Sequence, residues 1–461
     1  MTNKKFTVSR RDFLSNAALI GASGTLGAGS LLTSCSGEKN NERKYTPLRP
    51  ASEVYIPDLP DKAMEGRPIK AALIGCGGRG TGAVINLLDA ADGVSIIACA
   101  DMFKDKMDAC RASLKEQKNL VIPDENCFLG FDAYKKAIDV PGVELVLICP
   151  PGLFHPYHLQ YAVEKGKHVF CEKPPAIDPA GYRKFVMAAR QAKDKNLCVV
   201  MGTHLRHKRG YVEAYKRIQE GYIGNIVSGS VYCAQPHTHY MLQRPEWTDI
   251  EYMLRSQFCW IWTSGDILVD QLLHNVDAFT WFSHLKPVSA IGSGACHRRK
   301  NGDVYDVYSV CIEYEGGVRV YGIERQMDSC GNVFGEYIQG TKGAFDNVGD
   351  RCALIDLEGN EIWKFDHEAE KAQYKQTNPY CLEHVNLVNH LRQGKTLNNA
   401  EAVSVSVMGC IMAREAAYTG KIVTWDQMVQ SDIDYMPADL SLRNVDRSKY
   451  TPPVPGTSPN V

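Results

Sequence analysis

The chain has 461 residues, of which 44% are hydrophobic and 23% are charged, and its formal net charge is −1. This composition is typical of a globular protein with room for two or three domains. A balanced charge gives no sign of nucleic-acid binding, and no stretch after residue 35 is apolar enough to span a membrane. The composition therefore argues against nucleic acid as a partner and against a membrane-spanning core.

Residues 1–35 predict a targeting signal rather than folded structure. Residues 9–14, SRRDFL, resemble the twin-arginine export signature, and residues 32–35, LTSC, resemble a bacterial lipobox. This resemblance implies export of the folded chain, lipidation at Cys35 and a periplasmic location on a membrane. The alternative is a chance double arginine before a signal anchor. Residues 36–66 are polar and rich in proline, which predicts a tether and an arm lying on the next domain.

A glycine-rich turn organises the next part of the chain. The apolar run 71–74 predicts a buried strand, residues 75–80 (GCGGRG) fit G-x-G-x-x-G, and residues 80–90 predict a helix. A second apolar run, 94–100, ends at Asp101, where a carboxylate can bind a ribose hydroxyl. This order predicts a dinucleotide site, and the alternative is an ordinary glycine turn. The predicted contacts are Gly75, Gly77, Gly78, Arg79, Gly80 and Asp101.

The choice between the two nicotinamide dinucleotides stays open at this stage. Asp101 favours NAD, because a carboxylate suits the free 2′-hydroxyl of its ribose. Arg79 could instead meet the 2′-phosphate of NADP.

Strands and helices alternate through the predicted dinucleotide-binding domain, residues 67–203. Such alternation predicts a parallel sheet with right-handed crossovers, that is, an α/β Rossmann domain. The expected later strands are 143–149, 168–171 and 197–202, and the expected helices are 104–116, 131–139, 155–165 and 181–195.

Further motifs resemble one enzyme family. The glycine motif is followed by Cys149-Pro150-Pro151 with His155, by Gly166-Lys167-His168-Val169 and by Glu172-Lys173-Pro174. This succession resembles the Gfo/Idh/MocA oxidoreductases, which include glucose–fructose oxidoreductase and inositol dehydrogenase. The family usually has threonine where Pro150 stands. The resemblance covers about residues 68–430 and implies that Pro151, His155, Glu172 and Lys173 contact the dinucleotide.

The second half is expected to form an α+β substrate domain, residues 204–440, with an open, mostly antiparallel sheet. Alternating polar and apolar residues predict strands at 307–314, 318–323 and 352–357. Residues 382–393 and 401–418 predict amphipathic helices, and 441–461 an extended tail.

The strongest catalytic candidates are Asp270 and His274. They are four residues apart in a stretch with helical spacing, so they are expected to share one helix face. A carboxylate one turn from an imidazole can fix its orientation and raise its basicity. The alternative is a surface pair without function. By resemblance to the family pattern, in which Gly265 also matches, His274 is the general base and Asp270 its positioning partner.

Lys173 is the third catalytic candidate, since a lysine at the end of a strand can donate to a substrate oxygen. Arg206, His237 and Trp262 are candidates for a sugar pocket, with ordinary packing as the alternative for each. The pair His237 and His239 is too little for a metal site, so no metal is expected. The 16 cysteines lack metal or redox spacing, which favours buried free thiols, although an oxidising compartment could pair a few.

The favoured function is an NAD(P)-dependent oxidoreductase that takes hydride from a secondary alcohol of a sugar, polyol or glycoside. In the periplasm the cofactor would have to be tightly bound, because no free pool exists there. The alternatives are a glycoside hydrolase that oxidises its sugar transiently with bound NAD, and a non-catalytic sugar-binding lipoprotein. The family resemblance also implies a homo-oligomer.

Overall fold

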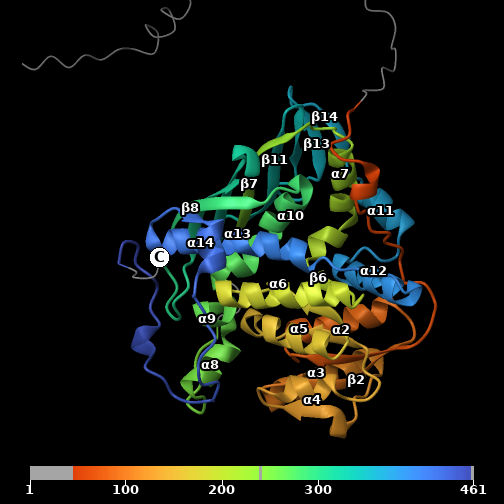
Figure 1. Cartoon of the computed structure of the whole chain (residues 1–461), viewed down its shortest axis with the longest axis vertical. Coiled ribbons are helices and arrows are strands. Elements are labelled where there is room, and N and C mark those ends of the chain that lie inside the picture. The colour runs from red at the N-terminus through yellow and green to blue at the C-terminus, as the bar shows by residue number, and fades with distance from the viewer. Residues whose placement is uncertain (1–44, 238–240, 458–461) are drawn as a thin grey trace, which may run out of the picture. The chain divides into compact units, whose positions relative to one another are not determined.

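The computed structural model describes residues 45–237 and 241–457 (Figure 1). Residues 1–44 lie outside the described residues, and with them the predicted export signal and Cys35. The rest of the chain contains two sheets, one of six strands and one of nine. No described helix is long and apolar enough to cross a membrane.

The first sheet is parallel and confirms the predicted Rossmann architecture. Its strand order is β3-β2-β1-β4-β5-β6. Strands β1 to β3 are added toward one edge and β4 to β6 toward the other, and such sheets bind ligands where this order reverses, here between β1 and β4. The strands are β1 Ile69–Ile74, β2 Val94–Asp101, β3 Cys127–Leu129, β4 Leu145–Ile148, β5 His168–Glu172 and β6 Val199–Gly202, and the helices are α2 Gly78–Ala90, α3 Lys104–Lys118, α4 Ala133–Ile138, α5 His155–Glu164 and α6 Pro179–Asp194.

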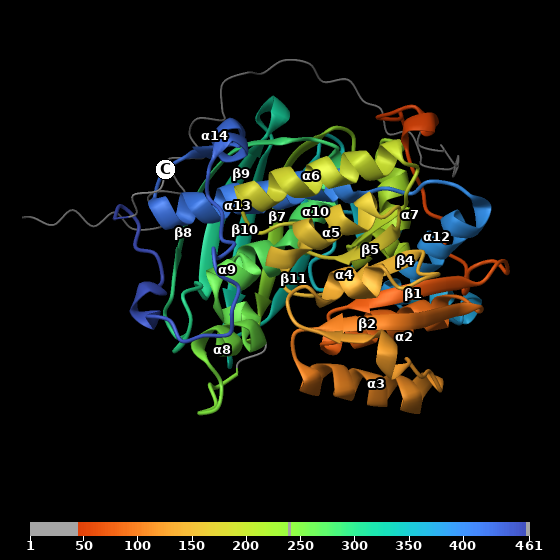
Figure 2. The same ribbon diagram turned by 60° about the horizontal axis from the view of Figure 1, so that its bottom comes forward.

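Helices cover both faces of this sheet, which explains its continuous apolar strands. In β4, Leu145 and Leu147 pack into one hydrophobic cluster, with α2 and α3. Val146 and Ile148 pack into another, with α4, α5 and α6, and all four side chains are fully buried. Figure 2 shows the two helix layers on opposite sides of β1 and β2. The strand needs apolar residues at every position because neither face meets water.

The second sheet is mixed and mostly antiparallel, as predicted. Its order is β14-β13-β12-β11-β7-β10-β9-β8-β15, and only the β7–β10 pair is parallel among the strands described. The strands are β7 Ile226–Gln235, β8 Pro287–Ala295, β9 Val307–Tyr314, β10 Arg319–Gln326, β11 Val333–Gly340, β12 Gly343–Asp346, β13 Ala353–Asp356, β14 Glu361–Lys364 and β15 Val423–Thr424. The accompanying helices are α7 Arg209–Gln219, α8 Asp249–Arg255, α9 Ile261–Ser264, α10 Leu273–Ser283, α11 His367–Gln373, α12 Pro379–Gln393, α13 Ala400–Thr419 and α14 Trp425–Gln430.

Two helices of the second half complete the first domain. Helix α12 packs on α2, and α13 lies between α6 and β8 (Figure 1). Between them, Leu397 and Asn399 exchange backbone hydrogen bonds with Val199 of β6, at 2.9 and 3.2 Å. The chain therefore returns to cover the last edge of the parallel sheet, which brings residues near 380 beside the strand ends of the first domain.

The described cysteines, fifteen in number, are all free thiols and most are buried, in agreement with the expectation from their scattered positions. Residues 54–64 form an arm that contacts both domains: Ala63 donates to the carbonyl of Ala90 in α2 at 2.7 Å, Met64 donates to the amide oxygen of Asn389 in α12 at 2.8 Å, and the carbonyl of Leu59 accepts from Arg209 of α7.

His158 of α5 predicts an acid-sensitive fold. It is 6% exposed and stacks on Tyr134 at 4.0 Å, and burial, followed by the charge of His155, lowers its pKa to about 3. Between about pH 6.5 and about pH 3, His158 therefore binds a proton in the unfolded chain but not in the folded chain. The free energy of unfolding falls as the pH falls through this window. At pH 5 the cost is about 2 kcal/mol.

We expect His158→Phe, which keeps the ring stack, to reduce the difference in Tm between pH 7.5 and pH 5. Differential scanning fluorimetry at both pH values measures it. His297→Gln, at an exposed histidine, is the control and should leave the difference unchanged. An H158F protein as acid-sensitive as the wild type would contradict the assignment.

Candidate functional site

The glycine turn between β1 and α2 leaves open space at the start of the helix. A Cβ at Gly77 or Gly78 would meet no heavy atom of the described chain within 4 Å. Gly77 is the N-cap of α2, and no described side chain caps the helix there. The first backbone N–H groups of α2 are thus free for an anion, as a dinucleotide pyrophosphate requires.

Gly80 is required by close packing of the turn itself. A Cβ at Gly80 would lie 1.8 Å from the carbonyl oxygen of Gly75, which is main chain and cannot swing away. Gly75 in turn has φ +90° and lies against the backbone of Cys149. The absence of a side chain at Gly80, the third glycine of the motif, therefore lets the start of α2 pack directly on Gly75.

We expect Gly80→Ala to weaken dinucleotide binding about 10- to 100-fold, because overpacking of this kind costs about 1–3 kcal/mol. Isothermal titration with NAD measures the loss. Gly82→Ala, in the same helix, is the matched control, since its Cβ would meet Arg79 at an ordinary 3.7 Å. Equal affinity of the two variants would show that the turn does not hold the dinucleotide.

Asp101 at the end of β2 is fixed toward the turn. Its Oδ2 accepts from the Cys76 amide at 2.6 Å, and its Oδ1 accepts from the Phe103 amide at 2.7 Å. Burial raises the pKa of this carboxyl, against the lowering effect of the two amides. One lone pair on each oxygen remains, so the carboxylate can accept a hydrogen bond from a ribose hydroxyl. That hydroxyl would lie beside the dinucleotide cradle, that is, the glycine turn and the first N–H groups of α2. The predicted glycines and Asp101 thus lie together.

His155 connects the ends of β4 and β5. Its ring nitrogens lie 2.7 Å from the carbonyl oxygen of Pro174 and 2.8 Å from that of Pro150, and the side chain is fully buried. Burial lowers its pKa to about 4, so the neutral ring donates through one nitrogen at a time. His155, predicted as a dinucleotide contact, therefore acts through the strand ends that it holds. Pro151 begins the turn that follows β4.

Lys173 joins the two domains. Its Nζ donates to the backbone oxygen of Asp270 at 2.6 Å and to the carboxylate Oδ1 at 3.1 Å. Asp270 lies in a π-helical turn, Leu268–Leu272, rather than in the regular α-helix that the spacing predicts. The wider turn displaces Asp270 from the face expected by four-residue spacing. Its carboxylate accepts from Lys173 and Gln271, so in this structure Asp270 orients the lysine.

His274 lies one turn farther along, in α10, and is 9% exposed. No described residue hydrogen-bonds its Nδ1. Its ring meets that of His204 edge-on, with centroids 4.7 Å apart. Burial lowers the pKa of His274 well below 6.5, and His204, Lys173 and Arg79 add to this effect. The imidazole is neutral at neutral pH and can accept a proton.

Arg79 extends from the glycine turn to the end of β5. It donates to the carboxylate of Glu172, lies 3.8 Å from Glu383, and places its guanidinium 4.5 Å from the ring centre of Tyr380. The Tyr380 ring stacks on His204 at 4.4 Å. Burial raises the pKa of Glu383 well above its usual value, and the charge of Glu172 adds to the effect.

His204, Tyr380 and Glu383 were not predicted from the sequence. His204 follows the carboxyl end of β6, so the rule that ligands bind at strand ends could have indicated it. Tyr380 and Glu383 lie in α12, about 180 residues after His204, and carry no local signal. Buried polar atoms without a hydrogen-bond partner among the described residues gather here, on Arg79, His204, His274 and Glu383, as in a site shaped for a polar ligand.

Contacts within the protein involve all three predicted sugar contacts, Arg206, His237 and Trp262. Arg206 makes a double ion pair with Asp277, at 2.7 and 2.8 Å, so its guanidinium holds the fold together. Trp262 is 6% exposed and packs in the core with its indole N–H 3.4 Å from the sulfur of Met253. His237 follows the end of β7, and its backbone N–H donates to the carboxylate of Asp328 at 3.0 Å. None of these contacts brings the three together.

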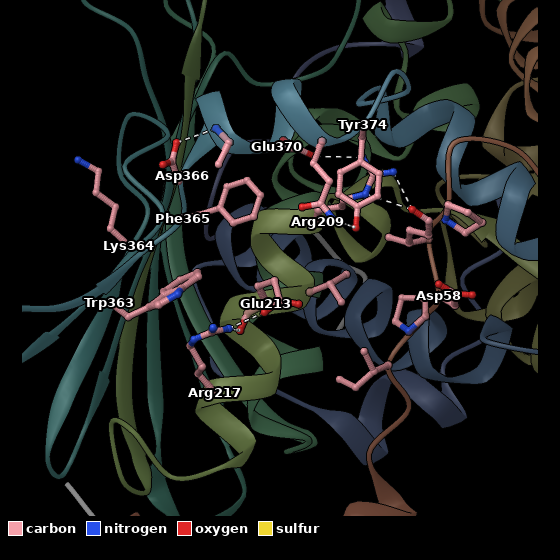
Figure 3. A pocket seen from close by; sticks show the side chains of 17 residues that line it. Asp58, Arg209, Glu213, Arg217, Trp363, Lys364, Phe365, Asp366, Glu370 and Tyr374 are labelled. Atoms are coloured by element: carbon pink, nitrogen blue, oxygen red, sulfur yellow. Dashed lines mark hydrogen bonds and ion pairs between the residues drawn. The ribbon is translucent and has the colours of Figure 1, made fainter. Parts of the chain in front are cut away.

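Figure 3 shows a cavity of about 680 Å³ that is lined by another part of the chain than the catalytic candidates. Arm residues 56–60, helix α7 and residues 363–374 line it. Arg217 pairs there with Glu213 at 2.6 Å and covers the ring of Trp363 at 4.5 Å. No predicted catalytic or dinucleotide-binding residue lines this cavity.

Relatives of known activity match parts of the chain. Myo-inositol 2-dehydrogenase of Thermotoga maritima is 24% identical over 301 residues, which span 61% of this chain and 80% of that enzyme. 1,5-anhydro-D-fructose reductase of Ensifer adhaerens is 29% identical over 185 residues, 39% of this chain and 49% of the reductase. The chain thus spans about half the length of the reductase.

Solved structures share the fold. The scyllo-inositol dehydrogenase of Lactobacillus casei, with bound NAD(H) and scyllo-inositol, superposes with a TM-score of 0.58 at 18% identity, over 77% of this chain and 99% of that one. The aldose-aldose oxidoreductase of Caulobacter crescentus, complexed with glycerol, gives 0.58 at 18% identity over 78% and 100%.

Family models account for both domains. The model of the oxidoreductase family with an NAD-binding Rossmann fold matches residues 69–201, and the model of the GFO/IDH/MocA C-terminal domain matches residues 211–346. Together they cover more than half of the chain, with the strands of the first sheet and strands β7 to β12 of the second. The chain therefore belongs to the Gfo/Idh/MocA family of oxidoreductases, with an NAD-binding Rossmann domain followed by the family's C-terminal domain.

Proposed function

We propose that this protein oxidises a secondary alcohol of a polyol or sugar, with His274 as the base and Lys173 as the hydrogen-bond donor to the reacting oxygen. The observation that carries the proposal is the contact between Lys173 and Asp270. It brings the end of β5, beside the dinucleotide cradle, to the helix on which His274 stands.

The bound nicotinamide would accept hydride from the carbinol carbon. The protein must then take up the hydroxyl proton, and the neutral imidazole of His274 is suited to do so because burial keeps it unprotonated. Lys173 uses two of its three N–H groups on Asp270. The third is left for the substrate oxygen, where it would stabilise developing negative charge.

We propose NAD rather than NADP as the cofactor. Asp101 stands at the end of β2, whereas Arg79 is held at the end of β5 by Glu172, and strands β1 and β4 lie between. Arg79 is thus placed away from the ribose that would carry the extra phosphate. Titration of the purified protein with each dinucleotide tests this, and tighter binding of NADP would contradict it.

Polyols and aldoses are the proposed substrates. Relatives are named as inositol dehydrogenases and an anhydrofructose reductase, and one structural neighbour as an aldose-aldose oxidoreductase. The test is a panel of myo-inositol, scyllo-inositol, glucose and an aryl glycoside, each assayed with NAD for absorbance at 340 nm. Turnover with at least one polyol or aldose supports the proposal. Release of the aglycone without net NADH would favour the hydrolase instead.

The open face of the second sheet supports a homo-oligomer. Three exposed apolar side chains lie on one side of it: Ile291 of β8 at 50%, and Tyr321 and Ile323 of β10 at 52% and 45%. A second copy covering this face would remove them from water. Light scattering of the wild type and of Tyr321→Glu tests it, and a monomeric wild type would contradict it.

Export as a lipoprotein rests on residues 9–14 and 32–35 alone, and so does tight retention of the cofactor in a compartment without a free pool. We propose both together. Membrane fractionation of the full chain and of Cys35→Ala tests the anchor, and a C35A protein that still sediments with membranes would contradict it.

A further inference from the structure

Four cysteines gather beside the dinucleotide cradle. They come from four different elements: the glycine turn (Cys76), β2 (Cys99), α3 (Cys110) and β3 (Cys127). The Cys76 thiol is in hydrogen-bonding contact with those of Cys99 and Cys110, and Cys99 with that of Cys127. In the described part of the chain, no group of three or more His, Cys, Asp or Glu side chains is arranged to hold a metal ion.

We propose that Cys99 and Cys127 are an oxidation site that closes to an internal disulfide. The two residues are directly opposite each other in the parallel pairing of β2 with β3, and their Sγ atoms are 3.5 Å apart. Neighbouring strands lie about 4.8 Å apart, within the Cα separation of about 4.4–6.8 Å that disulfides span. A bond of about 2.0 Å needs only a small rotation of the two side chains.

The two thiols differ in access. Cys99 is fully buried, whereas Cys127 is partly exposed and its Sγ approaches the carbonyl oxygen of Pro123 at 3.3 Å. A reagent from solvent therefore meets Cys127 first. Cys99, whose Sγ is 3.5 Å from that of Cys127, is placed to complete the exchange from inside the protein.

The reaction is a thiol–disulfide exchange with a small external disulfide. Cys127 attacks one sulfur of the reagent, forms a mixed disulfide and releases the first thiol. Cys99 then attacks the Cys127 sulfur, forms the internal disulfide and releases the second thiol. Two protein thiols are oxidised and one external disulfide is reduced to two thiols, so atoms and electrons balance.

The bond would fasten the edge of the sheet next to the cradle. Strand β3 has three residues and, among the described strands, pairs only with β2, which ends at Asp101. The backbone oxygen of Asp101 accepts from Gly130, directly after β3, at 3.1 Å. A Cys99–Cys127 bond would hold both ends of this contact. We expect the oxidised protein to unfold about 5 °C higher than the reduced protein.

The test uses the full chain, purified with reductant, freed of it and treated with oxidised glutathione. After blocking of free thiols and digestion without reductant, mass spectrometry should find the Cys99 and Cys127 peptides cross-linked, 2 Da lighter than the pair. A wild-type protein with glutathione left on Cys127 and no such cross-link would overturn the proposal.

Three variants sharpen the test. Cys99→Ser should keep glutathione on Cys127, and Cys127→Ser should form no internal bond. Cys330→Ser, which removes the exposed thiol of another domain, should still form the Cys99–Cys127 bond. Circular dichroism of the reduced variants checks folding, and the wild-type peptide map needs no variant. A Cys127→Ser protein that gains the same rise in Tm on oxidation would also contradict the assignment.

Discussion

Replacement of His274 by Asn should lower kcat by about 10²–10⁴-fold, the range that loss of a general base produces. The side chain is buried, neutral and next to the lysine that joins the domains, so Asn can fill part of its space but cannot accept the proton. Affinity for NAD should remain within about twofold, because His274 lies outside the glycine cradle. Steady-state kinetics and NAD titration of the same preparation measure both quantities.

His284→Asn is the matched control for this variant. His284 is the left-handed C-cap of the same helix, at φ 57°, a conformation that Asn adopts readily. It should retain kcat. The wild-type profile of kcat/KM should also stay level down to about pH 6.5, because the pKa of His274 is lowered and its protonation comes only at more acid pH. An H274N enzyme with wild-type kcat would remove His274 from the mechanism.

Replacement of Lys173 by Met should lower kcat by about 10²–10³-fold, since one donor to the reacting oxygen is lost. The same change leaves the carboxylate of Asp270, whose side chain is 8% exposed, without its cation. Stability should therefore fall by about 3 kcal/mol. Kinetics and urea unfolding measure the two effects separately.

The double variant Lys173→Met/Asp270→Asn distinguishes catalysis from stability. Removal of the carboxylate charge should restore most of the lost stability, because no unpaired ion is then buried. Activity should stay low, because the donor is still missing. Recovery of activity together with stability would mean that Lys173 serves only the fold.

The first domain could be predicted because its signals are local. The run Leu145–Ile148 is apolar at every position, which is what a strand covered on both faces requires, and the glycine turn stands directly between strand and helix. The second sheet could be predicted as a class only. Its order places β7 between β10 and β11, strands about ninety residues later, and no local pattern encodes such pairing.

The sequence indicates the candidate catalytic residues but not the contacts that they make. Strand ends and residue spacing indicate Lys173, Asp270 and His274. The π-helical turn that places the Asp270 carboxylate on Lys173 depends on packing between the domains, which no local pattern encodes. Tyr380 and Glu383 enter from α12, and Cys127 meets Cys99 through strand register. Arg206 and Trp262 looked suited to a sugar because of their residue types, and burial shows them in other contacts.

The central claim is that this chain holds a nicotinamide dinucleotide and reduces it with a polyol or sugar. The most direct measurement is the absorption spectrum of the protein purified without added cofactor, with the dinucleotide identified in a denatured extract. The account predicts co-purified NAD, and a rise in absorbance at 340 nm when the right polyol or aldose is added. A protein that carries no dinucleotide, and binds neither NAD nor NADP on titration, would contradict it.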